Sequence, residues 1–192
     1  CTGLSAQSFG QNKVQYRNFN WNFIQTPHFD IYYYSGELNL AEFTATEAED
    51  AYEQISKHLL WDLKKRVSIL IYNSHNDFQQ TNVVQNYMSE GIGGVTELFK
   101  NRVIFPFSGD YEQFRHVIHH ELVHALINDM VYGGSMQHVV SSRTRIRVPI
   151  WSNEGLAEFL SSNWDTKADM VLRDIAIHER MPTVKELNYF MA

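Results

Sequence analysis

The pattern of hydrophobic and polar positions changes period several times along the chain, and each change predicts a new element. Residues 28–34 (HFDIYYY) are rich in β-branched and aromatic side chains, which predicts a strand. Residues 38–63 favour a helix, because alanines and glutamates dominate and apolar residues recur at helical spacing. Residues 66–72 (RVSILIY) form a short, mostly apolar run that is typical of a buried strand.

The middle of the chain predicts two more strands and then a long helix. Residues 93–97 (GGVTE) and 102–107 (RVIFPF) flank the stretch LFKN, which predicts two strands joined by a turn. Pro106 indicates that the second strand ends there or lies at an edge. Asp110 offers a helix N-cap, and the helix is predicted to run to about Tyr132.

Helices are expected to fill the remainder of the chain. Gly133 and Gly134 stop the long helix. A second helix is predicted after Pro149 with Ser152 as its cap, and a third over residues 167–180. A β-α-β unit followed by strands and then helices predicts an α+β domain.

Composition and charge agree with one globular domain, or one domain with a small lobe. Hydrophobic residues make up 44% of the 192 residues and charged residues 20%, which is usual for globular proteins. The net charge of −6 does not suggest a nucleic-acid partner. No apolar run approaches the ~18 residues that a bilayer-spanning helix needs, and a single cysteine excludes an internal disulfide.

The N-terminal segment, residues 1–27, is polar and aromatic, and we expect it to be distinct from the domain over residues 28–192. Its first residues, CTGLSAQ, have three interpretations. They are the end of a signal peptide cleaved near Ala6, a processed bacterial lipoprotein start with a lipid anchor at Cys1, or an arbitrary boundary. The first two imply an exported protein that is periplasmic, outer-membrane-associated or extracellular.

The stretch HVIHHELVHA contains four histidines and one glutamate. At about 100° per residue, His116, His120 and His124 lie near one line along a helix. His119 lies about 100° away from His120, so it cannot share a metal ion with that line. Two ligand sets remain: the three aligned histidines, or His120 and His124 with Glu121 between them in the H-E-x-x-H pattern.

The H-E-x-x-H set has a clear chemical rationale. Two histidines at i and i+4 present nitrogens to one zinc ion without bending the helix. Glu121 would then lie beside the metal, where it can take a proton from bound water. His116, one turn further away, is interpreted as a helix-face residue or a neighbour of the ligands, and His119 as a packing or hydrogen-bonding residue.

A third ligand separates the classes of zinc site. A metzincin would need glycine at position 127 and histidine at 130, where this chain has Ile127 and Met130. Further on, the stretch VPIWSNEGLAEFLSS places Glu154 and Glu158 four residues apart, hence on one face of a predicted helix.

The apolar neighbours of this glutamate pair predict that its helix is largely buried. A buried carboxylate needs a metal ion or another partner. One carboxylate from this helix would complete a site of two histidines and one glutamate with a position open for water, which is the layout of catalytic zinc. The alternative is a solvated acidic face, which is how most glutamate pairs on helices behave.

The stretch HHELVHALI followed by PIWSNEGLAEFL resembles the gluzincin metallopeptidases, and more narrowly the bacterial peptidase-MA-like group, over roughly residues 93–163. The resemblance implies zinc bound by His120, His124 and Glu154. It implies Glu121 as the general base and Glu158 as a carboxylate that orients His120. It also implies a zincin-like (thermolysin-like) fold, in which a mixed sheet packs on the H-E-x-x-H helix and on a second ligand-bearing helix.

The resemblance makes a zinc-dependent endo- or aminopeptidase the expected function. The edge strand that the gluzincin fold places above the cleft falls on Gly94, Val95 and Thr96. An extended peptide or protein substrate could add there as a further strand. The alternative is that the glycines only form a turn. The alternatives are a zinc-binding module that acts in binding or scaffolding with weak or no catalysis, and hydrolysis of a non-peptide amide.

The chain departs from the gluzincin pattern in the residue that would stabilise the oxyanion. Family members have a tyrosine or histidine that stabilises the oxyanion, and here Tyr189, His178 and His138 are candidates of equal standing. The chain also stops soon after the third predicted helix, where family members continue. We therefore expect either a fragment with further domains on its C-terminal side or a chain without an efficient oxyanion donor.

Overall fold

The computed structural model describes residues 18–34, 36–80, 93–97, 101–133, 148–162, 164 and 166–190. Cys1, Ala6 and His138 lie outside the described residues, and so does the side chain of Tyr189. The predictions that concern a signal peptide, a lipid anchor and two of the three oxyanion candidates therefore lie outside them as well.

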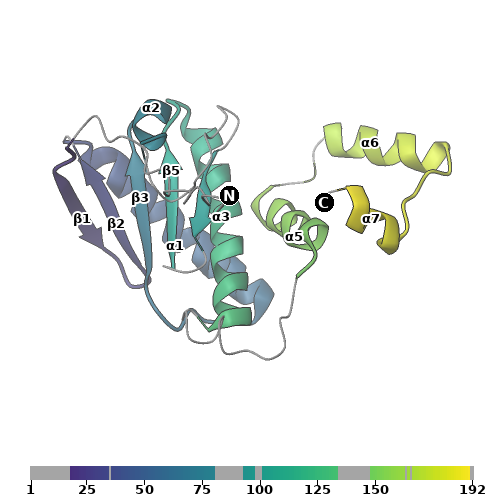
Figure 1. The fold of residues 1–192 in the computed structure, drawn as a ribbon, viewed down its shortest axis with the longest axis horizontal. Helices are drawn as coiled ribbons and strands as arrows, with labels where there is room; N and C mark the ends of the chain where they lie inside the picture. The colour runs from purple at the N-terminus through teal and green to yellow at the C-terminus, as the bar shows by residue number, and fades with distance from the viewer. Residues whose placement is uncertain are drawn as a thin grey trace, which may run out of the picture.

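The fold is an α+β arrangement built on one mixed sheet of five strands in the order β1-β2-β3-β5-β4 (Figure 1). The strands are β1 (Trp21–Gln25), β2 (Phe29–Tyr34), β3 (Val67–Tyr72), β4 (Val95–Glu97) and β5 (Arg102–Pro106). The three central strands, β2, β3 and β5, run parallel to one another. The edge strands β1 and β4 are antiparallel to their neighbours.

Six helices are described: α1 (Leu38–Leu59), α2 (His75–Phe78), α3 (Tyr111–Tyr132), α5 (Ile150–Ser161), α6 (Thr166–Ile177) and α7 (Val184–Phe190). The helices α1 and α3 pack against the sheet, and α5 packs against α3. In Figure 1, α6 and α7 lie beyond α5, on the side away from the sheet. None of the described helices combines the length and apolar character that a bilayer-spanning segment requires.

The main core lies between the sheet and the helices α1 and α3. Alternate residues of β3, namely Val67, Ile69 and Ile71, are completely buried, as expected for one face of a covered strand. Ile118 and Leu122 of α3 are completely buried in the same cluster. Burial of apolar surface is the dominant stabilising term in folding, so this core fixes α3 against the sheet.

The boundaries predicted for the long helix are confirmed. The Asp110 side chain accepts hydrogen bonds from the backbone N–H groups of Glu112 at 2.9 Å and Gln113 at 3.1 Å, which satisfies two donors at the start of α3. Gly133 follows the helix with φ of 63°, a left-handed conformation that costs glycine little. The two predicted strands around LFKN are confirmed as the antiparallel pair β4 and β5.

Other elements differ from the prediction. The strand β1 and the short helices α2 and α7 are not predicted by the hydrophobic pattern. Ser152 lies inside α5 and does not cap it. The helix begins earlier because the Pro149 carbonyl accepts the N–H groups of Ser152 and Asn153, each at 3.0 Å, and proline has a backbone φ suited to a helix start.

Glu49 on α1 ties this helix to the connection between β1 and β2. Its Oε1 accepts the backbone N–H of His28 at 2.9 Å, and its Oε2 lies 2.6 Å from Nδ1 of the same histidine. Burial alone would raise the pKa of Glu49, but hydrogen bonds from His28 and Thr26 outweigh burial and lower it. The ionised form therefore stabilises the fold above the unfolded-state pKa, and this contribution is lost as the pH falls through the folded-state pKa.

We expect Glu49→Gln to lower the free energy of unfolding by about 1 kcal/mol at pH 7, since a charge-assisted contact is lost from a partly solvent-screened site. Urea denaturation followed by circular dichroism measures this difference. The difference should shrink as the pH falls through the lowered folded-state pKa of Glu49, because the wild-type carboxylate then becomes protonated as well. The matched control is Glu53→Gln on the same helix, whose ion pair with Lys57 is exposed. Equal losses in the two variants would contradict a specific role for Glu49.

Candidate metal centre

The candidate centre lies where α3 packs against α5. His120 and His124 are one turn apart on α3, so both rings project from the same side of the helix. Glu154 lies near the start of α5 and reaches the same place from the other helix. Three potential ligands are thereby brought together from positions up to 34 residues apart.

Three side-chain atoms converge at this place. His120 Nε2 lies 3.2 Å from His124 Nε2 and 3.3 Å from Glu154 Oε2, and His124 Nε2 lies 3.5 Å from the same oxygen. Atoms that bind one tetrahedral ion at about 2.0–2.1 Å are separated from one another by about 3.3 Å. The triangle therefore has the size of one face of a tetrahedral metal site, and this group could hold a metal ion.

Glu121 lies beside the triangle without belonging to it. Its Oε2 accepts a hydrogen bond from Thr96 Oγ1 at 2.6 Å. A pocket of about 320 Å³ contains the triangle and this carboxylate. Its walls are Gly94, Val95, Thr96, His120, Glu121, His124, Asn128, Asn153 and Glu154. The structure thus brings the predicted ligands, the predicted base and the predicted edge strand into a single cavity.

Glu158 lies on the other side of the His120 ring. Its Oε2 is 3.6 Å from His120 Nδ1 and 3.7 Å from His116 Nε2, which is longer than a hydrogen bond. Its Oε1 accepts the hydroxyl of Ser162 at 3.0 Å. His116, His120 and Glu158 form a second group that could hold a metal ion, and it shares His120 with the first group.

His119 is separate from both groups. Its Nε2 lies 3.7 Å from Glu47 Oε2 of α1, and only 12% of its side chain is exposed. Burial lowers the pKa of His119, which favours the neutral ring. This placement agrees with the interpretation of His119 as a packing residue.

No protein-family model, curated protein or solved structure matches this chain.

The helix α5 is much less buried than the sequence pattern predicts, so that expectation is wrong. Ala157 is its only buried residue, and the side chains of Glu154 and Glu158 are 41% and 60% exposed. The reason is that α5 packs on α3 through one face, while apolar residues such as Phe159 remain exposed on the others. Burial therefore does not oblige Glu154 to bind a metal, and the converging atoms of the triangle remain the observation that supports a site.

Two residues of the pocket were missed in the sequence. Asn128 follows His124 by one helical turn, and Asn153 immediately precedes Glu154. For Asn128 the spacing from His124 was the available signal, because positions i and i+4 of a helix share a face, whereas the position of Asn153 next to Glu154 gives no such signal. Both amides offer a donor and an acceptor to a bound molecule.

The oxyanion candidate His178 is not brought into the pocket. It follows the last turn of α6, and its Nδ1 contacts the Asp174 carbonyl at 2.8 Å. Among the described residues that line the pocket, neither tyrosine nor any third histidine is present.

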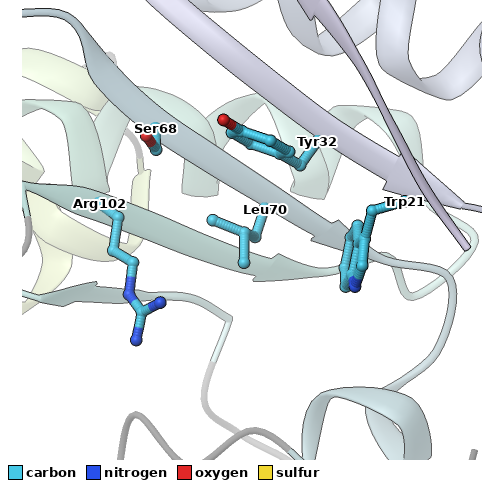
Figure 2. Close-up of a pocket in the computed structure, with 5 residues that line it drawn as sticks. All are labelled: Trp21, Tyr32, Ser68, Leu70 and Arg102. Atoms are coloured by element: carbon cyan, nitrogen blue, oxygen red, sulfur yellow. The ribbon is translucent and has the colours of Figure 1, made fainter. Parts of the chain in front are cut away.

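A second hollow, of about 430 Å³, lies on the sheet face opposite α1 and α3 (Figure 2). Figure 2 labels its lining residues, which are Trp21, Tyr32, Ser68, Leu70 and Arg102. Ser68 and Leu70 alternate along β3 with core residues, which explains why they point to the other face. None of the five is a histidine or a carboxylate, and the two groups of potential metal ligands found among the described residues both include histidines of α3.

Proposed function

We propose that this protein is a zinc-dependent peptidase of the gluzincin type, similar to the bacterial peptidase-MA-like group. The observation that carries the proposal is the triangle of His120, His124 and Glu154 with the carboxylate of Glu121 in the same pocket. The order of these residues along the chain supports it, because the H-E-x-x-H pattern on one helix is followed by a glutamate on the next.

The donor set suits zinc. Two imidazole nitrogens and one carboxylate oxygen are ligands that zinc accepts, and a three-residue set leaves a coordination position open. When bound in such a site, zinc acts as a Lewis acid and lowers the pKa of a coordinated water to about 7.

Glu121 is the general base in this proposal. Its carboxylate is not one of the three converging atoms, and it lines the cavity that a substrate would enter. In that place it accepts a proton from the attacking water and later donates it to the leaving amine. Glu158 is proposed to orient His120, since a carboxylate close to Nδ1 fixes the ring and increases the basicity of Nε2.

The substrate is proposed to be a peptide or protein bound in an extended conformation. The strand β4 forms one edge of the sheet and contributes Gly94, Val95 and Thr96 to the pocket. Within the described part of the chain, no strand pairs with the outer side of β4. A peptide could therefore add there as a further strand through its main chain, which would hold a scissile carbonyl close to the metal ligands.

One observation favours a second candidate function. The described lining of the pocket contains no tyrosine or third histidine to stabilise an oxyanion. A zinc-binding module with weak or no hydrolysis, which acts in binding or scaffolding, would have no need of such a group.

A peptide library incubated with the zinc-loaded protein separates the two functions. We expect cleavage that stops when a chelator removes the metal and resumes when zinc is added back. Zinc-loaded protein that retains its metal but cleaves no peptide would favour the binding module. Cleavage that continues in apo-protein verified to be metal-free would contradict a metallopeptidase.

A further inference from the structure

We propose that Thr96 is a positioning residue for Glu121, and that its hydroxyl holds the carboxylate of the general base in the orientation that catalysis needs. This inference rests on the proposed function. Thr96 Oγ1 lies 2.6 Å from Glu121 Oε2 and 3.1 Å from the backbone carbonyl oxygen of the same residue. The hydroxyl has one proton, and the short distance to a charged acceptor is typical of donation to the carboxylate.

The approach of β4 to α3 depends on two glycines. A Cβ atom at Gly94 would lie 2.9 Å from Glu121 Cγ and 3.0 Å from Phe105 Cδ1. A Cβ atom at Gly93 would lie 2.8 Å from Val117 Cγ2. The distances of 2.8 and 2.9 Å are shorter than real Cβ contacts, so any side chain at Gly93 or Gly94 would force a neighbouring side chain to shift. The segment before Thr96 is thus fitted to the part of α3 that carries Glu121.

The register of β4 directs the Thr96 hydroxyl at the site. Successive residues of a strand point to opposite faces of the sheet. Val95 packs on the far face, against the cluster of Tyr34, Tyr72, Phe78 and Ile104, and Glu97 forms an ion pair with Arg102. Thr96 lies between them and points to α3. Contacts on both sides of Thr96 therefore fix the direction of its side chain.

The hydrogen bond has a consequence for the mechanism. It occupies Oε2 of Glu121 and leaves Oε1 as the oxygen that accepts the proton. A free glutamate side chain samples many rotamers, and restricting it before the reaction removes an entropic cost from the chemical step. The side chain of Thr96 would thereby act on the base, while the main chain of β4 remains available to the substrate.

Two substitutions at this position separate the hydroxyl from the strand. Thr96→Val keeps the β-branched shape but removes the donor, whereas Thr96→Ser keeps the donor. For Thr96→Val we expect a fall in kcat of about tenfold with KM and zinc content unchanged, because the lost restriction affects only the chemical step. Thr96→Ser should retain most of the wild-type kcat.

A structural readout accompanies the kinetics. In crystals of Thr96→Val we expect the Glu121 carboxylate in more than one rotamer, and in crystals of Thr96→Ser a single ordered conformation. An unchanged kcat in Thr96→Val would overturn the proposal. Equal losses in the two variants would overturn it too, since they would assign the effect to strand packing. A rise in KM alone would show that the side chain binds substrate instead.

A double-variant comparison separates this proposal from the proposed function. If Thr96 acts through Glu121, adding Thr96→Val to Glu121→Gln should cause no further loss of activity. Wild-type activity in Glu121→Gln would refute the proposed function itself. An inactive Glu121→Gln combined with a fully active Thr96→Val would refute only the positioning role.

Discussion

Glu121→Gln is expected to lower the rate of peptide hydrolysis by roughly 10²–10⁴-fold, the usual contribution of a positioned general base, while the protein keeps its zinc. The carboxylate is not one of the three converging ligand atoms, so the metal site stays complete. The amide oxygen of glutamine can still accept the Thr96 hydroxyl, so the fold around the site should be retained. Glutamine cannot take a proton from water at neutral pH, and this is the only function removed.

The measurement combines kcat for a cleaved peptide with the zinc content per chain. Glu112→Gln is the matched control, because it removes an exposed carboxylate from the first turn of the same helix. That control should keep both activity and zinc. Cleavage at the wild-type rate by Glu121→Gln would show that another group activates the water, and loss of its zinc would show that Glu121 is a ligand.

Removing a ligand should have a different effect, with metal and activity lost together. We expect His124→Ala to weaken zinc binding by more than about 100-fold, since even residues that only support a ligand change affinity by about 10–100-fold. His124 is nearly buried, and its Nε2 forms one corner of the triangle. Competition with a chelator of known affinity measures the change.

His116→Ala is the control that distinguishes the two groups of potential ligands. His116 lies on the same face of α3 but belongs to the group with Glu158 and not to the triangle. The His116→Ala variant should therefore retain tight zinc binding. If His116→Ala loses zinc and His124→Ala keeps it, the metal is bound by the second group, and the proposed mechanism fails.

Local signals in the sequence predicted the elements that carry the site. Asp110 and Gly133 mark the two ends of α3 because a cap and a left-handed residue each act within one helical turn. The spacing of His120 and His124 predicted that their nitrogens face one point, because it depends only on helix geometry. The α+β class followed from the order of periodic segments, and it is confirmed.

Features that depend on packing between distant segments were not predictable in this way. The burial of α5 was overestimated because an apolar composition does not reveal how many neighbours cover a helix. The contact between Thr96 and Glu121 joins residues 25 positions apart, and it depends on glycines that let a strand approach a helix. The strand β1 was missed because its side chains are mostly exposed, so they show no buried face.

The most direct test of the central claim is an anomalous-difference map, at the zinc absorption edge, from crystals of zinc-reconstituted protein. We predict one strong peak about 2.0–2.1 Å from Nε2 of His120 and Nε2 of His124 and about 2.0–2.2 Å from a carboxylate oxygen of Glu154. Glu121 should lie beside the peak without binding it. A peak between His116 and Glu158, or no peak near any of these residues at full zinc loading, would contradict the account.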